Sequence, residues 1–318
     1  MIILSGGTGT PKLINGLRHL VPDEELHIIV NTGEDFYESG VLVTADIDTL
    51  LYLFSGDLDT SKWWGVRNET WHTYDHLKRL GYDELLPLSD FDRAVNILRT
   101  DLLNSGKTLT QATEIIAGKL GVSADICPMT DGKVDTMITM KDPETGIVSR
   151  EHYQNFWVGK KGRPEILKVE REGADQADLT EKVRRLLEDP DEKYVIIGPS
   201  NPVTSIGPIL SVSGMRDLLK TKTVIAVSPI IGNEPVSGPA GKLMKACGMD
   251  VSSVAVAEAY RDIIDIFVCD IRDSIMTPEE ASVFEKDGIC IERYDTLMKS
   301  GKESAELASF ILKLFDGC

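Results

Sequence analysis

Residues Ile2–Leu13 read IILSGGTGTPKL and contain, in order, an apolar run, a glycine-rich turn and the start of an amphipathic segment. The apolar residues 2–4 predict a short buried strand. Leu13, Leu17 and Leu20 share one helical face, so the segment after the turn is predicted to be a helix. A strand, a glycine turn and a helix in this order point backbone N–H groups and a helix N-terminus toward an anion.

The turn favours the binding of a nucleotide or phosphate. Gly6, Gly7 and Gly9 lack the Cβ atoms that would keep a phosphate away from the backbone. The turn is not a Walker A loop, because no Gly-Lys-Ser/Thr follows it, and Lys12 occupies the place of the third glycine in a dinucleotide fingerprint. A tight strand-to-helix turn without a ligand is the structural alternative. The candidate phosphate contacts are Gly6, Gly7, Thr8, Gly9 and Lys12.

Composition limits the class of protein. The chain has 318 residues, a formal charge of −17 and 42% hydrophobic residues, as expected for a globular protein of one or two domains. The acidic balance argues against a general nucleic-acid binder, which needs a basic surface. No apolar run is long enough for a membrane span, and the short N-terminal run leaves no room for a signal peptide. The five cysteines form no Cys-x-x-Cys pair, which predicts reduced thiols and a cytoplasmic location.

Three carboxylates follow the second predicted strand, His27–Asn31: Asp35, Asp46 and Asp48. Asp46 and Asp48 stand at a predicted helix start, where an aspartate commonly caps free N–H groups. Mg²⁺ on a phosphate substrate instead needs one or two carboxylates and keeps some of its waters. The residues alone leave helix capping and metal or substrate contact as equal alternatives.

Residues 50–122 have a mainly helical pattern and predict a helical insertion. Three of the four tryptophans lie within nine residues of one another: Trp63, Trp64 and Trp71. They could form a wall for a flat aromatic ligand, although an ordinary core cluster is the commoner role. His72 and His76 have helical spacing, but no Glu-x-x-His context supports a metal site, so a helix-surface pair is favoured.

The second half of the chain predicts more strands. Residues 134–140 alternate like a strand, and 154–158 and 166–169 have β-forming composition. We expect these segments to extend the main sheet and not to form a separate domain. Two apolar runs, 194–197 and 224–227, each lead into a loop of small polar residues.

In a parallel sheet, ligands bind at the carboxyl ends of the strands, so the loop 200–207 should lie on the same rim as the first glycine turn. The alternation of strands and helices predicts one α/β domain over residues 1–318, with a doubly wound, mostly parallel, Rossmann-like sheet.

Five motifs follow one another over nearly the whole chain: Gly6–Leu13, Thr44–Leu50, Glu69–His72, Ser200–Gly207 and Ser228–Gly232. In these motifs the chain resembles the 2-phospho-L-lactate transferase family, which acts in the biosynthesis of the deazaflavin coenzyme F-420 of methanogens and actinobacteria. The resemblance implies that lactyl-2-diphosphoguanosine donates a phospholactyl group to the terminal ribityl hydroxyl of the deazaflavin Fo. GMP would leave, and Mg²⁺ would assist.

The resemblance also implies roles for single residues. Asp46 and Asp48 would act in catalysis, and at least two of Asp35, Asp46 and Asp48 would hold Mg²⁺. Fo would contact Asp48, Trp63, Trp64, Pro87 and Leu88. The donor nucleotide would contact the first glycine turn and, in the second loop, Ser200, Asn201, Pro202, Ser205 and Gly207. The chain departs from the family pattern at Ser89, where relatives carry glycine, and at Phe91, where they carry a charged residue, so no charged contact to the acceptor is expected from position 91.

Two other classes compete with a transferase. A sister family of nucleotide-sugar-binding regulators has a similar glycine turn, but tends to carry Gly-Asp-Ile-Arg where this chain has Asp46–Thr49. The retained Asp48 favours the transferase. Lys12 in place of a glycine argues against a nicotinamide dehydrogenase. The expected partners are a small-molecule donor and acceptor, with no nucleic acid and no membrane, and a homodimer is the candidate assembly. The acid of the donor (lactate, enolpyruvate or glycerate) is left open.

Overall fold

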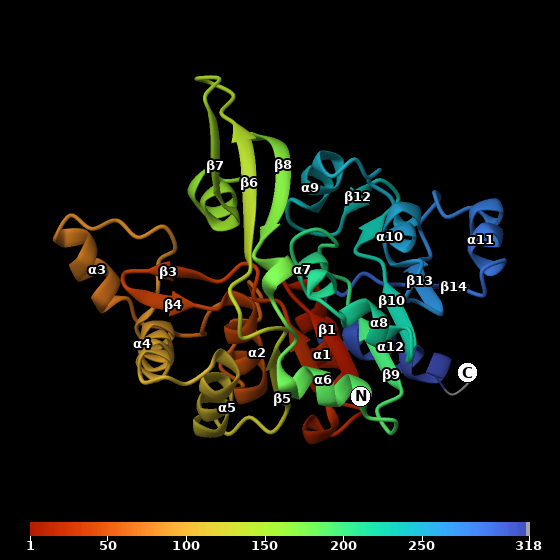
Figure 1. The fold of residues 1–318 in the computed structure, drawn as a ribbon, viewed down its shortest axis with the longest axis horizontal. Helices are drawn as coiled ribbons and strands as arrows, with labels where there is room; N and C mark the ends of the chain where they lie inside the picture. Colours follow the sequence, from red (N-terminus) through yellow and green to blue (C-terminus); the bar gives the residue numbers. More distant parts are fainter. Residues whose placement is uncertain (316–318) are drawn as a thin grey trace.

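A seven-stranded sheet forms the centre of the protein, for which a computed structural model describes residues 1–315 (Figure 1). Every pair of neighbouring strands in it is parallel. The strands, in order across the sheet, are β14 (Cys290–Tyr294), β13 (Ile266–Asp270), β10 (Thr223–Val227), β9 (Tyr194–Ile197), β1 (Ile2–Ser5), β2 (His27–Val30) and β5 (Asp125–Pro128). The predicted parallel α/β sheet is therefore confirmed.

Helices cover both faces of the sheet, so alternate strand residues enter two different cores. Ile3 and Ile28 join the core beneath one helical layer, and Leu4 and Ile29 join the other core. The first layer contains α1 (Gly9–Leu17), α2 (Ala45–Ser55), α5 (Leu109–Lys119) and α12 (Gly301–Phe315). The second contains α6 (Glu181–Glu188), α7 (Ile206–Ser211), α8 (Met215–Leu219) and α10 (Ser253–Tyr260). Burial on both faces explains why the inner strands β1, β9 and β10 are nearly continuous apolar runs.

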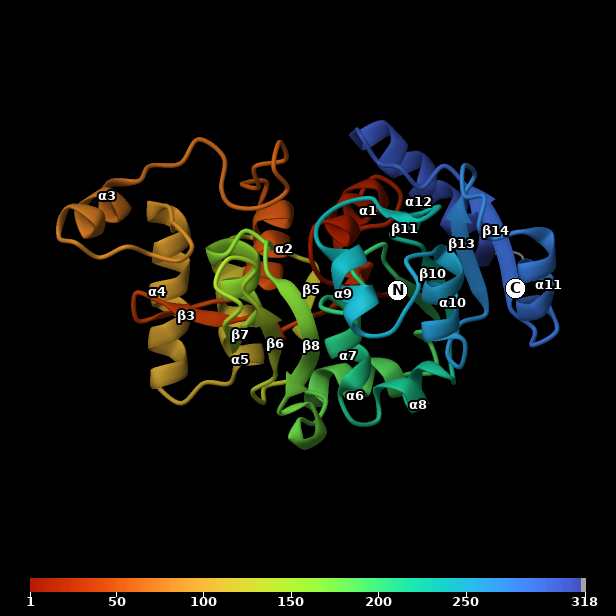
Figure 2. The same cartoon turned by 90° about the horizontal axis from the view of Figure 1, so that it is seen from above.

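Figure 2 shows this layering from above, with α1 and α12 on one side of the sheet and α6, α7 and α8 on the other. The other elements lie around the sheet: β3 (Phe36–Glu38), β4 (Val41–Val43), α3 (His72–Arg79), α4 (Asp90–Asn104), β11 (Ile230–Ile231), β12 (Glu234–Pro235), α9 (Ala240–Ala246) and α11 (Pro278–Glu285). In residues 1–315, no helix is both long and apolar enough to cross a membrane.

A second sheet projects from the main body (Figure 1). It is three-stranded and antiparallel, with β6 (Asp135–Lys141) between β7 (Val148–His152) and β8 (Glu165–Glu172). The expectation that these strands extend the main sheet is therefore wrong. The strand predicted at 154–158 is also wrong, because Asn155–Gly159 forms a short π-helical turn. The buried residues Tyr153, just before this turn, and Phe156, within it, are three residues apart, which is a helical interval. A short apolar run in the sequence does not distinguish a strand from a helical turn.

The order of the central strands locates the candidate site. Starting from β1, the chain first builds the sheet outward through β2 and β5, and then returns to the other side of β1 with β9. The sheet therefore changes its winding direction between β1 and β9. In open α/β sheets, ligands bind at such a switch point, outside the carboxyl ends of the two strands.

Candidate active site

The two loops that leave β1 and β9 are joined by hydrogen bonds at the switch point. The Ser200 hydroxyl donates to the Gly6 carbonyl, and the Thr10 N–H donates to Ser200 Oγ over 3.1 Å. A Cβ atom on Gly9 would lie 1.9 Å from the Pro199 carbonyl oxygen, so only glycine allows this approach. The glycine turn thus has a packing role between the two loops in addition to the one that the sequence indicates.

A cavity of about 590 Å³ opens from these two loops. Its size lies in the range of small-molecule sites. Its lining combines polar residues of the glycine turn and of the loop after β9 with the side chains of Tyr52, Trp64, Pro87 and Trp157. The residues around it include Gly7, Thr8, Gly9, Lys12, Glu34, Asp46, Asp48, Tyr52, Trp64, Leu86, Pro87, Asp92, Tyr153, Gln154, Trp157, Ser200, Asn201, Thr204, Ser205, Ser228, Pro229, Thr296 and Met298.

Asp46 is buried between the two loops, in the first turn of α2. It accepts a hydrogen bond from the Gly7 N–H over 2.7 Å and one from the Asn31 side-chain amide over 2.8 Å. Burial raises the pKa of Asp46 to about 6, although both hydrogen bonds oppose that rise. The carboxylate therefore holds the glycine turn in place and caps none of the N–H groups of its own helix, which removes the capping alternative for this residue.

Asp48 forms a buried ion pair with Arg99 of α4, and both carboxylate oxygens are used. Arg99 is fully buried and also donates to Asn96 Oδ1 over 2.6 Å. Burial raises the pKa of Asp48, and the adjacent guanidinium opposes that rise. Asp48 also accepts a hydrogen bond from the Thr44 N–H over 3.3 Å, which is the capping contact that its position predicts.

Two more acidic residues lie nearby, of which Glu34 is buried and Asp35 is half-buried. Glu34 borders the cavity, whereas Asp35 does not. Burial raises the pKa of both well above their ordinary values, and the charge of Asp46 adds to the rise in each case. In residues 1–315, no group of three or more His, Cys, Asp or Glu side chains is arranged to hold a metal ion by itself.

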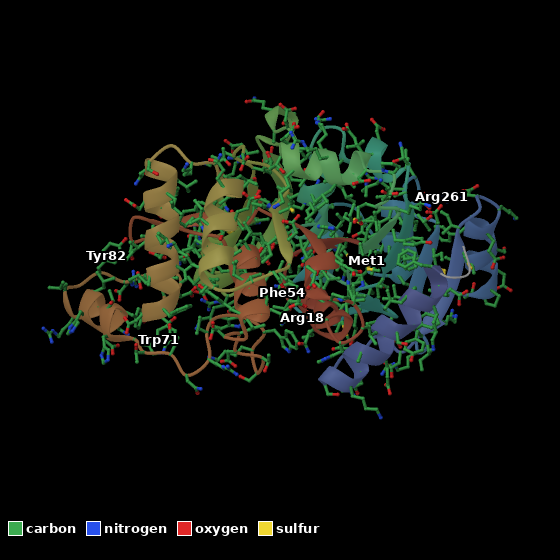
Figure 3. All side chains as sticks on the ribbon, turned by 90° about the horizontal axis from the view of Figure 1, so that it is seen from below. Met1, Arg18, Phe54, Trp71, Tyr82 and Arg261 are labelled. Carbon is green, nitrogen blue, oxygen red and sulfur yellow. The ribbon has the colours of Figure 1, made fainter. Side chains whose placement is uncertain are left out.

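The tryptophans have three different environments. Trp64 borders the cavity, as does Pro87. Trp63 instead packs against the core with a left-handed backbone (φ 63°), and the Lys12 ammonium lies 5.8 Å from the centre of its ring. Trp71 is exposed at the start of α3, far from Phe54 and the core (Figure 3). Leu88 is fully buried outside the cavity wall, so the acceptor wall expected from the sequence keeps only Trp64 and Pro87 at the cavity.

The residues expected to contact the nucleotide fall into two groups, those that line the cavity and those that do not. Seven of them line the cavity: Gly7, Thr8, Gly9, Lys12, Ser200, Asn201 and Ser205. Gly6, Pro202 and Gly207 lie behind this surface. A Cβ atom on Gly207 would meet the Arg171 guanidinium at 2.1 Å and the Pro202 carbonyl oxygen at 2.8 Å, so Gly207 serves loop packing. Burial lowers the pKa of Lys12, which has no carboxylate partner among the described residues.

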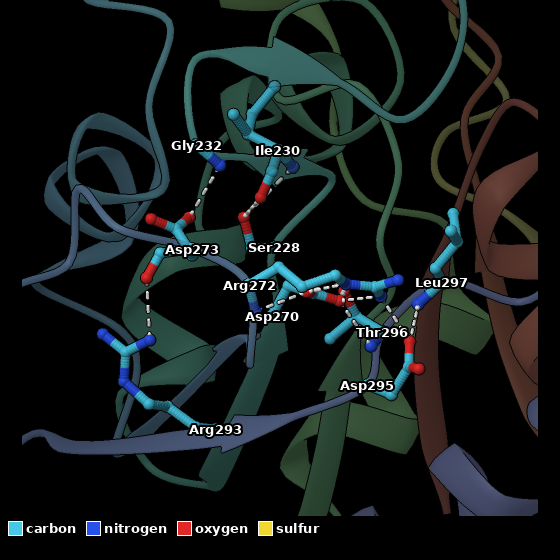
Figure 4. A network of polar contacts seen from close by, with 10 residues as sticks. All are labelled: Ser228, Ile230, Gly232, Asp270, Arg272, Asp273, Arg293, Asp295, Thr296 and Leu297. Carbon is cyan, nitrogen blue, oxygen red and sulfur yellow. Dashed lines mark hydrogen bonds and ion pairs between the residues drawn. The ribbon is translucent and has the colours of Figure 1, made fainter.

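Several cavity residues are missing from the sequence-based candidates. Tyr52 and Asp92 come from α2 and α4, and Thr296 follows β14. Helical periodicity marks Tyr52 as core and Asp92 as a residue near a helix start, so no local pattern indicates that they meet. Thr296 is held by Asp270 at the end of β13, which accepts hydrogen bonds from its N–H (2.9 Å) and hydroxyl (3.0 Å) (Figure 4).

Comparison of the sequence with known proteins places the chain in one family. The model of the family described as 2-phospho-L-lactate transferase CofD matches residues 1–296. The chain is 51% identical to a 2-phospho-L-lactate transferase of Methanosarcina acetivorans over 316 residues, which cover 99% of both chains. It is 46% identical to the protein of that name from Methanocaldococcus jannaschii over 277 residues, covering 87% of this chain and 88% of the relative. A crystal structure of a UPF0052-family protein from Bacillus halodurans has a TM-score of 0.62, covers 98% of each chain and is 16% identical, so it supports the fold alone.

Proposed function

The chain belongs to the 2-phospho-L-lactate transferase family and is a transferase, and from this premise we propose its substrates. The donor is lactyl-2-diphosphoguanosine and the acceptor is the terminal ribityl hydroxyl of Fo. The reaction joins the phospholactyl group to the acceptor oxygen and releases GMP, in line with a role in coenzyme F-420 biosynthesis.

One observation carries this proposal: the lining of a single cavity contains a phosphate-type glycine turn, aromatic and proline side chains, and buried carboxylates. The N–H groups of Thr8 and Gly9 and the Ser205 hydroxyl offer donors to a diphosphate, whereas the Gly7 N–H and the Ser200 hydroxyl already donate to Asp46 and to the Gly6 carbonyl. Trp64 and Pro87, in the lining of the same cavity, offer apolar surface to a tricyclic ring. A transfer between two such substrates needs positioning and neutralisation of charge more than a covalent nucleophile.

The residues of the site fit Mg²⁺. Glu34, Asp46 and Asp48 are buried and Asp35 is half-buried. These four acidic side chains outnumber the basic ones at the site, which are Arg99, paired with Asp48, and the lining residues Lys12 and Lys62. Asp46 and Asp48 both border the cavity and would hold the ion together with the donor phosphates. When bound, Mg²⁺ would neutralise charge on the transferred group. Asp35 lies outside the cavity wall and would act on the ion only through its charge.

The proposal is tested by turnover with defined substrates. The purified chain is incubated with Fo, Mg²⁺ and donors that carry lactate, enolpyruvate or glycerate, and the deazaflavin product and GMP are measured chromatographically. We expect equal amounts of both products with at least one donor. Asp48→Asn should lower turnover by orders of magnitude, whereas Asp75→Ala, an exposed carboxylate on α3, should not.

Fo fluorescence separates the enzyme from a regulator. We expect Fo to bind wild-type protein in the micromolar range, and Asp48→Ala to weaken binding about tenfold or more (about 1.4 kcal/mol). Because this change leaves Arg99 unpaired, the melting temperature of each variant is measured in parallel. A wild-type protein that binds no Fo at any concentration, with or without GDP and Mg²⁺, would favour the nucleotide-sugar-binding regulator.

A further inference from the structure

Asp92 borders the cavity from the first turn of α4. The Tyr52 hydroxyl donates a hydrogen bond to Asp92 Oδ1 over 2.6 Å, and Tyr52 is itself buried and fixed in α2. No described residue donates a hydrogen bond to the second oxygen, Oδ2. The carboxylate is therefore oriented by one oxygen and left with accepting capacity at the other.

Asp48 also borders the cavity, but its two oxygens are paired with a cation. Both accept hydrogen bonds from the Arg99 guanidinium, and one also accepts from the Thr44 N–H. A carboxylate that is bound to a guanidinium on both oxygens is a poor proton acceptor, because the adjacent positive charge favours its ionised form. Asp92 has no such ion pair among the described residues.

This inference rests on the proposed function. We propose that Asp92 is the catalytic base that receives the proton of the attacking acceptor hydroxyl, and that Tyr52 positions the Asp92 carboxylate. In the step, the acceptor oxygen forms a bond to the phosphorus that bears the lactyl group, and the bond from that phosphorus to the oxygen of GMP breaks. The electron pair of the broken bond leaves with GMP. The hydroxyl proton passes to Asp92 Oδ2 and later to solvent.

The electrostatic surroundings of Asp92 are suited to this role. Burial and the charge of Asp48 raise the pKa of Asp92 to about 6, whereas the Tyr52 hydrogen bond and Arg99 lower it, and Glu69 raises it slightly. These groups come from α2, from α4 itself and from the segment before α3. A base whose pKa lies near the working pH combines availability in the ionised form with useful basicity.

The test uses three variants of the whole chain. Asp92→Asn keeps the shape of the side chain and removes its basicity. Asp101→Asn changes an exposed carboxylate on the same helix and is the matched control. We expect Asp92→Asn to lower turnover about 10²- to 10⁴-fold with unchanged GDP affinity, and Asp101→Asn to leave both unchanged. Tyr52→Phe removes a hydrogen bond that lowers the pKa of Asp92, so the acidic limb of the pH profile for kcat/KM of Fo should move to higher pH.

These experiments distinguish a failure of the role of Asp92 from a failure of the proposed function. If wild-type protein turns over Fo and Asp92→Asn retains the wild-type rate, Asp92 is not the base. An unchanged pH limb in Tyr52→Phe also excludes Asp92 as the base, even if Asp92→Asn fails to fold. A purely structural role for Asp92 predicts an equal loss at every pH, whereas loss of a base predicts a deficit that changes along the acidic limb. If wild-type protein does not act on Fo at all, the proposed function fails, and the role of Asp92 as its base fails with it.

Discussion

At the residue scale, the site depends on close contacts that a single side-chain substitution would break. The approach of Gly9 to the Pro199 carbonyl joins the loop after β1 to the loop after β9. The ion pair between Asp48 and Arg99 joins α2 to α4 in the same way. Each contact joins two elements that both contribute residues to the cavity lining, so each affects both stability and the shape of the site.

Gly9→Ala should damage both properties. Its Cβ atom would lie 1.9 Å from the Pro199 carbonyl oxygen, and backbone cannot yield as the end of a side chain can. We expect the free energy of unfolding to fall by about 2 kcal/mol or more and GDP binding to weaken. Gly118→Ala is the control, because that glycine is helical with open space around it, and it should gain about 0.5–1 kcal/mol. Urea unfolding and titration calorimetry measure both effects, and equal stability of the two variants would contradict the close approach.

At the scale of elements, α3 and α4 cap one another. Asp90 of α4 accepts hydrogen bonds from the His72 and Thr73 N–H groups at the start of α3, each over 3.0 Å. Glu69, just before α3, accepts one from the Phe91 N–H of α4 over 2.6 Å. The hydrogen bonds that Asp90 accepts from Thr70, His72 and Thr73 lower its pKa. Since α3 buries none of its own residues, these contacts hold it in place.

Asp90→Ala should release α3 without unfolding the sheet. An isolated helix of this length is unstable in water, so the loss of its cap should expose Lys78 and Arg79 to trypsin. Asp83→Ala removes an exposed carboxylate from the same segment and should leave the digestion rate unchanged. Limited proteolysis followed by mass spectrometry gives the cleavage sites. Resistance equal to wild type, with the same melting temperature, would show that α3 does not depend on this cap.

At the scale of the whole molecule, the cavity concentrates negative charge in a protein that already carries a formal charge of −17. Burial raises the pKa of Asp46 to about 6 and those of Glu34 and Asp35 well above their ordinary values. These groups bind protons more tightly in the folded chain than in the unfolded chain. The stability that they contribute is therefore complete below about pH 4 and is lost as the pH rises through about 6 and above.

We therefore expect the free energy of unfolding to fall between pH 5 and pH 7.5 in urea titrations without divalent ions, and Mg²⁺ to oppose that fall. Mg²⁺ at about thirtyfold its dissociation constant should add about 2 kcal/mol at pH 7.5 and less at pH 5. The control is NaCl at equal ionic strength, and in Asp46→Asn the Mg²⁺ effect should shrink. Stability that rises over this pH range, or responds equally to NaCl and Mg²⁺, would contradict a cation site at these carboxylates.

The amino-acid sequence alone predicts the central sheet and the glycine turn that borders the cavity. Apolar runs such as 2–4 and 194–197 predict buried parallel strands, because a strand covered on both faces must be apolar throughout. The glycine turn after the first run marks a strand-to-helix connection, since its backbone geometry is encoded locally. The same local patterns failed at 154–158, where a short apolar run fits a strand and a helical turn equally well.

Which side chains meet in the cavity follows from tertiary packing and not from any local pattern. Trp63 and Trp64 are neighbours in sequence, yet one packs on the core and the other borders the cavity, because a left-handed backbone at Trp63 turns them apart. Asp48 meets Arg99 across 51 positions, and Tyr52 meets Asp92 across 40. Periodicity describes how a residue relates to its own helix or strand, whereas these pairs depend on how α4 packs beside α2, which is a property of the folded chain.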